Sequence, residues 1–251
     1  MQSSPNGVLL EARDLRKSFG GVHAVDGCSF AVPRGKISGL IGPNGSGKTT
    51  TFNLLTGLTH PDEGRVLYQG KDIGGLKPYE VFRRGITRTF QVTRIFREMT
   101  VLENMLSVIG LGVPDRIARE RADELIDLVN LTRLRAEYGG RLSYGQQKLL
   151  EFARALMTRP DLILLDEPAA GVNRTLLQQL LAQIHHLKEQ GTTVLIVEHD
   201  MNVIMNHCDW IFVMDHGATI AEGPPAAIQR DERVVEAYFG RRRATADHAV
   251  R

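Results

Sequence analysis

The sequence has few cysteines and no long apolar run. Only 2 cysteines occur among 251 residues, and neither Cys28 nor Cys208 has the spacing of a metal site or of a Cys-x-x-Cys redox pair. We therefore predict two small core residues in a reducing cytosol. No stretch approaches the roughly 20 apolar residues of a membrane-spanning helix, and the first residues lack the apolar segment of a signal peptide. Contact with a membrane must then come through another protein or through the surface.

The sequence also lacks a strong charge of either sign. Its 31 basic and 29 acidic residues leave a formal net charge of +2, so no global basic field favours nucleic acid as a partner. The basic clusters at 83–84 and 241–243 are more typical of solvated faces than of nucleic-acid sites. With 251 residues, 42% of them hydrophobic, the chain is long enough for one large α/β domain.

The order of apolar patterns predicts two kinds of sheet. Short β-rich runs within 8–32 and at 65–70 predict a small antiparallel layer. Residues 37–41 predict a buried strand that leads into a glycine-rich turn and a helix. Helical periodicity then covers about 100–135, and helices alternate with the strands Leu-Ile-Leu-Leu-Asp and Thr-Val-Leu-Ile-Val-Glu before a terminal hairpin. This alternation predicts a mainly parallel sheet as the core.

A phosphate-binding loop is predicted between the first buried strand and its helix. Residues 42–49 read Gly-Pro-Asn-Gly-Ser-Gly-Lys-Thr and fit the pattern G-x-x-x-x-G-K-[ST]. The glycines allow successive backbone N–H groups to face a triphosphate, the Lys48 ammonium can reach the β- and γ-phosphates, and the Thr49 hydroxyl can bind Mg²⁺. The following helix directs its positive end at the anion. The alternative is a glycine-rich structural turn.

An acidic pair ends the strand Leu162 to Asp166. We predict Asp166 as a Mg²⁺ ligand and Glu167 as the base that polarises the water attacking the γ-phosphate, because neighbouring strand residues point apart. The alternative is a solvated acidic pair at a strand end. The prediction favours hydrolysis over binding alone.

Leu142-Ser143-Tyr144-Gly145-Gln146-Gln147, placed between the phosphate loop and the acidic strand, resembles the signature of ABC-transporter ATPases. Taken alone, it would better suit an ordinary helix capped by Ser143. The resemblance implies that the Ser143 hydroxyl and the Gly145 N–H contact the γ-phosphate of ATP held by a second subunit. Tyr144 stands where the family most often has glycine, which leaves those contacts intact.

The same resemblance implies roles for residues that would carry little information in isolation. It implies that Gln91 senses Mg²⁺ and the attacking water and links the site to the membrane subunit. It also implies that His199 contacts the γ-phosphate, and that Phe19 stacks on adenine with Val25 nearby, although core packing is the alternative for Phe19. Asn173 occupies the inter-subunit loop, where the family more often has aspartate. The implied nucleotide-binding residues are Phe19, Val25, Gly42, Pro43, Asn44, Gly45, Ser46, Gly47, Lys48, Thr49 and Thr50, with Ser143, Gly145 and Gln146 in trans.

The resemblance narrows to the bacterial branched-chain amino acid importers. Its supporting segments are 88–91, 95–96, 99–104, 166–171, 197–200 and 235–240. It implies an ATPase at the cytoplasmic face of the inner membrane, paired with a second ATPase subunit, two permeases and, indirectly, a periplasmic binding protein. Its expected fold is a P-loop NTPase ABC cassette within 1–251, with a core at 8–90 and 155–240, a helical subdomain at about 92–154 and a polar tail at 241–251.

Other functions stay open at this point. An exporter, a lipid transporter or a urea or amide transporter could use the same cassette, because the solute is not written in this subunit. A soluble ABC protein acting on ribosomes or DNA would carry two cassettes or a long coiled-coil insertion, for which the interval from Gln91 to Ser143 is too short. A GTPase would need a guanine-reading Asn-Lys-x-Asp segment, which the sequence lacks.

Overall fold

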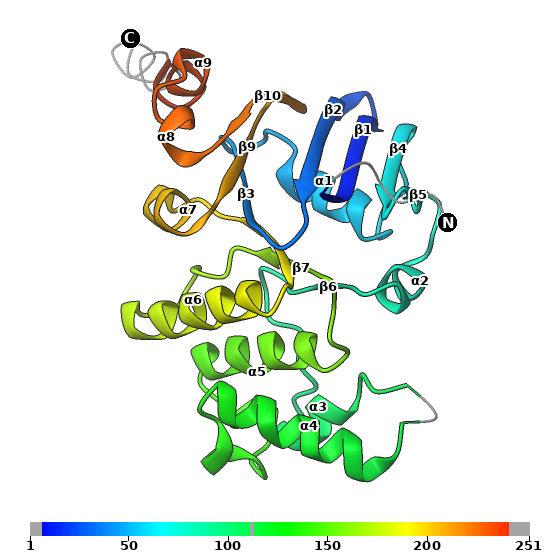
Figure 1. Cartoon of the computed structure of the whole chain (residues 1–251), viewed down its shortest axis with the longest axis vertical. Coiled ribbons are helices and arrows are strands. Elements are labelled where there is room, and N and C mark those ends of the chain that lie inside the picture. The colour runs from blue at the N-terminus through cyan, green and yellow to red at the C-terminus, as the bar shows by residue number, and fades with distance from the viewer. Residues whose placement is uncertain (1–6, 111–112, 241–251) are drawn as a thin grey trace.

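A mainly parallel sheet forms the centre of the chain. The computed structural model describes residues 7–110 and 113–240, so the predicted tail at 241–251 lies outside the described residues (Figure 1). The central sheet has the strand order β10-β9-β3-β8-β7-β6, with every neighbouring pair parallel except β10 and β9. Its strands are β3 (Ile37–Ile41), β6 (Ile86–Arg88), β7 (Leu162–Asp166), β8 (Thr193–Val197), β9 (Trp210–Asp215) and β10 (Ala218–Gly223). The predicted α/β fold class is confirmed.

An antiparallel sheet forms a second layer. It has the order β2-β1-β4-β5, and its strands are β1 (Val8–Phe19), β2 (Val22–Pro33), β4 (Glu63–Tyr68) and β5 (Lys71–Asp72). Alternate residues of the parallel strands enter different cores: Leu40 packs with the antiparallel layer, whereas Ile41 packs with the helices on the other face. The central strands are therefore buried on both faces, which explains their continuous apolar runs.

Helices cover the parallel sheet and extend the molecule at one end. The longer helices are α1 (Lys48–Leu55), α4 (Asp115–Leu128), α5 (Tyr144–Leu156) and α6 (Arg174–Glu189). Helices α3 (Val101–Leu106), α4 and α5 gather at the end away from the antiparallel sheet, and α6 lies between α5 and the parallel sheet (Figure 1). The apolar residues at helical spacing in α4 are buried: Ala118, Ala122, Leu125 and Ile126.

Sequence periodicity missed the short elements, because a repeating apolar pattern does not develop in fewer than two helical turns or in a strand of two or three residues. These are α2 (Pro78–Arg83), α7 (Met201–His207), α8 (Pro225–Ile228), α9 (Glu232–Val235) and the short strands β5 and β6. Their signals lie in the caps instead. Pro78 begins α2, and the Asp200 side chain accepts a hydrogen bond from the backbone N–H of Asn202 at 2.8 Å.

Two expectations about composition can be compared with the structure. Cys28 and Cys208 are free and buried, as predicted, and burial raises their thiol pKa values to about 11 and about 12. Among residues 7–110 and 113–240, no helix combines the length and the apolar character needed to cross a bilayer.

Candidate ATP site

The phosphate loop connects β3 to α1 in a conformation that requires glycine. Gly47 has a φ of +99°, and a Cβ placed there would lie 2.3 Å from the Ala24 carbonyl oxygen. Gly42 is equally confined, since its Cβ would lie 2.2 Å from the Met214 carbonyl oxygen. By contrast, Gly45 has a φ of +81° and open space beside it. The loop is therefore packed from behind and open at its tip.

Lys48 is buried against this loop, and its partners in the loop are neutral oxygen atoms rather than a carboxylate. Its ammonium donates to the carbonyl oxygens of Gly42 at 2.8 Å and Pro43 at 2.9 Å. Burial lowers the Lys48 pKa, and the negative charge of Glu167 opposes that shift. A cation held by carbonyl dipoles beside a helix N-terminus suits a phosphate group, and the neighbouring Thr49 is exposed.

Three residues predicted to act together follow three adjacent strands. Gln91 follows β6, Glu167 follows β7 and His199 follows β8. The carboxyl ends of adjacent parallel strands meet at one edge of the sheet. Gln91 Nε2 donates to Glu167 Oε2 at 2.9 Å, and His199 Nε2 lies 2.8 Å from Glu167 Oε1. Each oxygen of the Glu167 carboxylate therefore contacts one of the other two predicted catalytic residues.

The two carboxylates separate for a reason other than the predicted one. Strand alternation does not apply, because β7 ends at Asp166 and Glu167 has a φ of +48° in the left-handed region. The chain turns sharply between the two residues. Asp166 stays buried, and its Oδ2 lies 2.7 Å from the Arg88 guanidinium. This buried ion pair was not foreseen, although Arg88 precedes Gln91 in the segment that carried the resemblance.

Two further buried residues hold the backbone around Glu167. Lys148 donates to the Glu167 carbonyl oxygen at 2.9 Å from the second turn of α5. Glu198 accepts from the backbone N–H groups of Ala169 at 2.6 Å and His199 at 3.0 Å, so it links the loops after β7 and β8. Burial raises the Glu198 pKa and lowers the Lys148 pKa. Sequence reasoning assigned neither role, since only the fold brings these segments together.

The signature residues lie at the start of α5, away from the phosphate loop of the same chain. Ser143 caps the helix, accepting from the Gln146 backbone N–H at 3.4 Å, while Gln146 Oε1 accepts from the Ser143 N–H at 2.9 Å. Gln146 thus serves the cap in this structure. Gly145 packs closely on Leu176, because a Cβ would lie 2.5 Å from Leu176 Cδ2. Within the described residues, no hydrogen bond joins the signature to 42–49.

Phe19, Val25 and Asn173 lie in three other places. Phe19 is 51% exposed at the end of β1, with the Lys17 ammonium 5.5 Å from its ring centroid. Val25 is buried in the core beside Ala24, which backs the phosphate loop. Asn173 caps α6, its side chain accepting from the Leu176 N–H at 2.9 Å.

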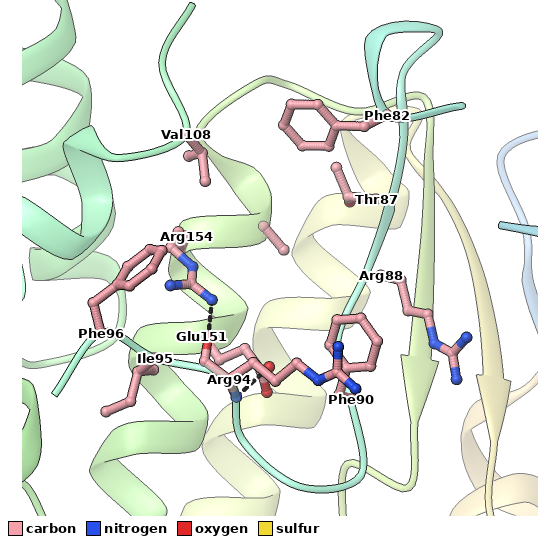
Figure 2. A pocket seen from close by; sticks show the side chains of 11 residues that line it. Phe82, Thr87, Arg88, Phe90, Arg94, Ile95, Phe96, Val108, Glu151 and Arg154 are labelled. Atoms are coloured by element: carbon pink, nitrogen blue, oxygen red, sulfur yellow. Dashed lines mark hydrogen bonds between the residues drawn. The ribbon is translucent and has the colours of Figure 1, made fainter. Parts of the chain in front are cut away.

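A groove of about 570 Å³ lies next to residues 89–92, called the Gln91 segment below, between β6 and α5 (Figure 2). Its lining combines aromatic rings with cations: the Arg94 guanidinium lies 4.0 Å from the Phe90 ring centroid, and that of Arg154 lies 5.4 Å from the Phe96 ring centroid. Glu151 is buried in the same groove and accepts from the Arg94 backbone N–H at 3.0 Å. Arg94 and Phe96 remain exposed.

Comparison with known families agrees with this geometry. Residues 25–170 match the model of the ABC transporter family. The chain belongs to this family. Its residues 218–244 also match the model of the branched-chain amino acid ATP-binding cassette transporters. The protein is therefore an ATP-binding, ATP-hydrolysing cassette, as predicted.

Individual relatives share most of their length with this ABC cassette. It is 41% identical to the high-affinity branched-chain amino acid transport ATP-binding protein of Pseudomonas aeruginosa, covering 92% of this chain and 98% of that one. It resembles the crystal structure of a nucleotide-free ATP-binding cassette from an ABC transporter, with a TM-score of 0.83, 38% identity and coverage of 92% and 98%. It also resembles the dimeric, post-hydrolysis structure of a cassette bound to ADP and Pi, with a TM-score of 0.79, 26% identity and coverage of 86% and 99%.

Proposed function

We propose that this ABC cassette uses ATP hydrolysis at Glu167 to energise the import of branched-chain or other small hydrophobic amino acids. The observation that carries the chemistry is the cluster in which Gln91 and His199 each bind one oxygen of the Glu167 carboxylate. The solute is proposed from the match of residues 218–244 and from the names of the relatives.

Glu167 is suited to act as a general base. Its side chain is 15% exposed, so it is shielded yet reachable by water, and its charge acts on Lys48 in the phosphate loop. A carboxylate in such a position can accept the proton of a water molecule that attacks the γ-phosphate. His199 and Gln91 fix its orientation and can contact the γ-phosphate and the water.

Oxygen groups next to the loop suit Mg²⁺. Thr49, Gln91 and Asp166 offer a hydroxyl, an amide and a carboxylate, which are the hard ligands this cation prefers. When bound, Mg²⁺ neutralises charge on the phosphates. Asp166 pairs with Arg88 here, so it would hold the cation either through its other carboxylate oxygen or after releasing Arg88. In either case Arg88 neutralises Asp166 before nucleotide binds.

A second ATPase subunit completes the proposed site. Ser143 and Gly145 lie apart from their own phosphate loop, and the Ser143 hydroxyl accepts the cap bond with a lone pair, so its proton is available to a phosphate. A symmetric pair would place each signature against the ATP of the other subunit. The resemblance to a dimeric cassette supports this arrangement.

Permease subunits are proposed to dock at the groove beside Gln91. The exposed Arg94 and the rings of Phe90 and Phe96 fit a cytoplasmic permease segment that carries an acidic residue and an apolar side chain. The groove adjoins the segment that contacts Glu167, so docking can act on the site. The chain would then lie at the cytoplasmic face of the inner membrane, with a periplasmic binding protein delivering solute on the far side.

Uptake in cells whose own copy of this chain is replaced tests the proposal. We expect Lys48→Ala to reduce uptake of labelled leucine, isoleucine and valine to background, because the phosphates lose their cation. The exposed Lys36→Ala is the matched control and should leave uptake unchanged. Arg94→Glu should lose uptake while the purified subunit keeps its ATP hydrolysis. Normal uptake of all three amino acids in the Lys48→Ala cells would show that the proposed solutes are wrong.

A further inference from the structure

Tyr144 makes contacts that are not part of the role expected of the signature. It is the first residue of α5, and its hydroxyl donates to the backbone carbonyl oxygen of Gln91 at 3.3 Å. Its ring lies against Gly171, where a Cβ would be 2.7 Å from Tyr144 Cε1. Gly171 also has a φ of +71°, so glycine is favoured there both by backbone conformation and by the ring. One side chain thus touches the Gln91 segment and the loop that follows Glu167.

The next turn of the same helix reaches Glu167 itself. Lys148 is four residues after Tyr144 and therefore on the same face of α5. Its ammonium lies 5.6 Å from the Tyr144 ring centroid and donates to the Glu167 carbonyl oxygen at 2.9 Å. Lys148 is buried, which holds this contact in one geometry. Tyr144 and Lys148 together connect the start of α5 to Gln91, Glu167 and Gly171.

The same helix start carries the residues proposed to contact the partner's ATP. Ser143 and Gly145 flank Tyr144 directly, and the cap formed by Ser143 and Gln146 makes this turn a well-defined unit. A shift of the Gln91 or Gly171 backbone would press on the Tyr144 ring or stretch its hydrogen bond, and would move Ser143 and Gly145 with it. The contacts therefore run from one subunit's own hydrolytic residues to the residues that complete the other subunit's site.

We propose that Tyr144 is a positioning residue that couples the two ATP sites of the dimer. When Gln91 and Glu167 engage ATP in one subunit, Tyr144 sets the position of that subunit's signature on the ATP of the partner. This inference rests on the proposed arrangement of the signature in trans. It gives the tyrosine a role that glycine at this position could not fill, since glycine has neither ring nor hydroxyl.

Steady-state ATP hydrolysis by the purified full chain tests the coupling. Tyr144→Phe removes the hydroxyl and keeps the ring, whereas Tyr144→Ala removes both. Tyr79→Phe is the matched control, because Tyr79 is an exposed tyrosine early in α2 whose ring lies 5.6 Å from the Arg83 guanidinium carbon. For each variant, the Hill coefficient for ATP, kcat, the binding of a fluorescent ATP analogue by the monomer and Tm are measured.

We expect the wild-type Hill coefficient to lie above 1, with two coupled sites as its upper limit. Tyr144→Phe should lower it part of the way to about 1 and Tyr144→Ala the whole way, while analogue binding by the monomer stays unchanged. The Tyr79→Phe control should match the wild type. Loss of a hydrogen bond of this kind corresponds to a weakening of the coupling by about threefold to tenfold.

Two outcomes would overturn the inference, and they differ from each other. In the first, the wild type is cooperative and both Tyr144→Phe and Tyr144→Ala keep its Hill coefficient. Tyr144 then does not couple the sites, while the proposed dimer is still supported. If the wild type itself shows a Hill coefficient of 1 and no dependence on protein concentration, the arrangement in trans is wrong and the coupling is wrong with it. A fall in Tm with an unchanged Hill coefficient would show a purely structural role.

Discussion

At the scale of single residues, the surrounding contacts hold Glu167 in one conformation. The Glu167 backbone is held in the left-handed region, its N–H donates to Val197 O at 2.9 Å and its carbonyl accepts from Lys148. Its carboxylate is held by Gln91 and His199. The proposed base is therefore oriented before substrate arrives, which would lower the reorganisation needed in the reaction.

Glu167→Gln should separate ATP binding from hydrolysis. An amide keeps the size of the side chain and part of its hydrogen bonding but cannot accept the proton of the attacking water. We expect phosphate release to fall about 100-fold or more and an ATP-bound dimer to accumulate, as measured by light scattering. The control is Glu189→Gln, at the exposed end of α6. Turnover at the wild-type rate would show that Glu167 is not the base.

At the scale of elements, α5 serves as both a core helix and the carrier of the signature. Its inner face is buried through Leu149, Leu150 and Phe152, while its N-terminus is exposed at Ser143 and Tyr144. The capping box satisfies the first backbone N–H groups of the helix without closing off the helix end. The same cap residue therefore stabilises the helix and remains available to a phosphate.

A second capping box in the chain allows these two roles of Ser143 to be separated. Thr100 and Glu103 form the same reciprocal cap at the start of α3, at 3.2 Å and 2.7 Å. We expect Ser143→Ala and Thr100→Ala each to lower the free energy of unfolding by about 1 kcal/mol, measured by urea denaturation. Only Ser143→Ala should also reduce ATP hydrolysis, by about tenfold or more. Equal activities of the two variants would restrict Ser143 to its cap.

At the scale of the whole molecule, the proposed function assigns the phosphate loop and the signature of one chain to different sites. Their separation follows from the architecture: the loop follows the central strand β3, whereas the signature begins α5, which packs beside β6 at the edge of the sheet (Figure 1). In the proposed arrangement, a single chain therefore supplies half of each of two sites and completes neither by itself.

Hydrolysis should consequently depend on protein concentration. At saturating ATP, the rate per subunit should rise with the concentration of the chain and reach a plateau once dimers predominate, because a monomer offers no signature to its own ATP. Coupled phosphate assays over a dilution series, with light scattering of the same samples, measure this. A constant rate per subunit in samples that contain only monomers would contradict it.

Local sequence carried much of the prediction. The strand at Ile37–Ile41 coincides with its prediction and a helix, Lys48–Leu55, follows the glycine-rich turn as predicted, because continuous apolar runs and glycine-rich turns are local signals. Short elements such as α7 escaped, as did the ion pair between Arg88 and Asp166. Such a contact depends on strand order, which single-sequence patterns do not contain.

The sequence by itself determined which groups have the chemistry to bind a triphosphate and activate water. The loop from Gly42 to Thr49 and the adjacent pair Asp166 and Glu167 are consecutive residues, so their chemistry follows from the order of the chain. Only the tertiary structure decided which groups act together. Gln91, Glu167 and His199 meet because β6, β7 and β8 are neighbours in the sheet, and Tyr144 meets Gln91 and Gly171 because α5 packs beside that edge. Contacts between distant segments depend on packing.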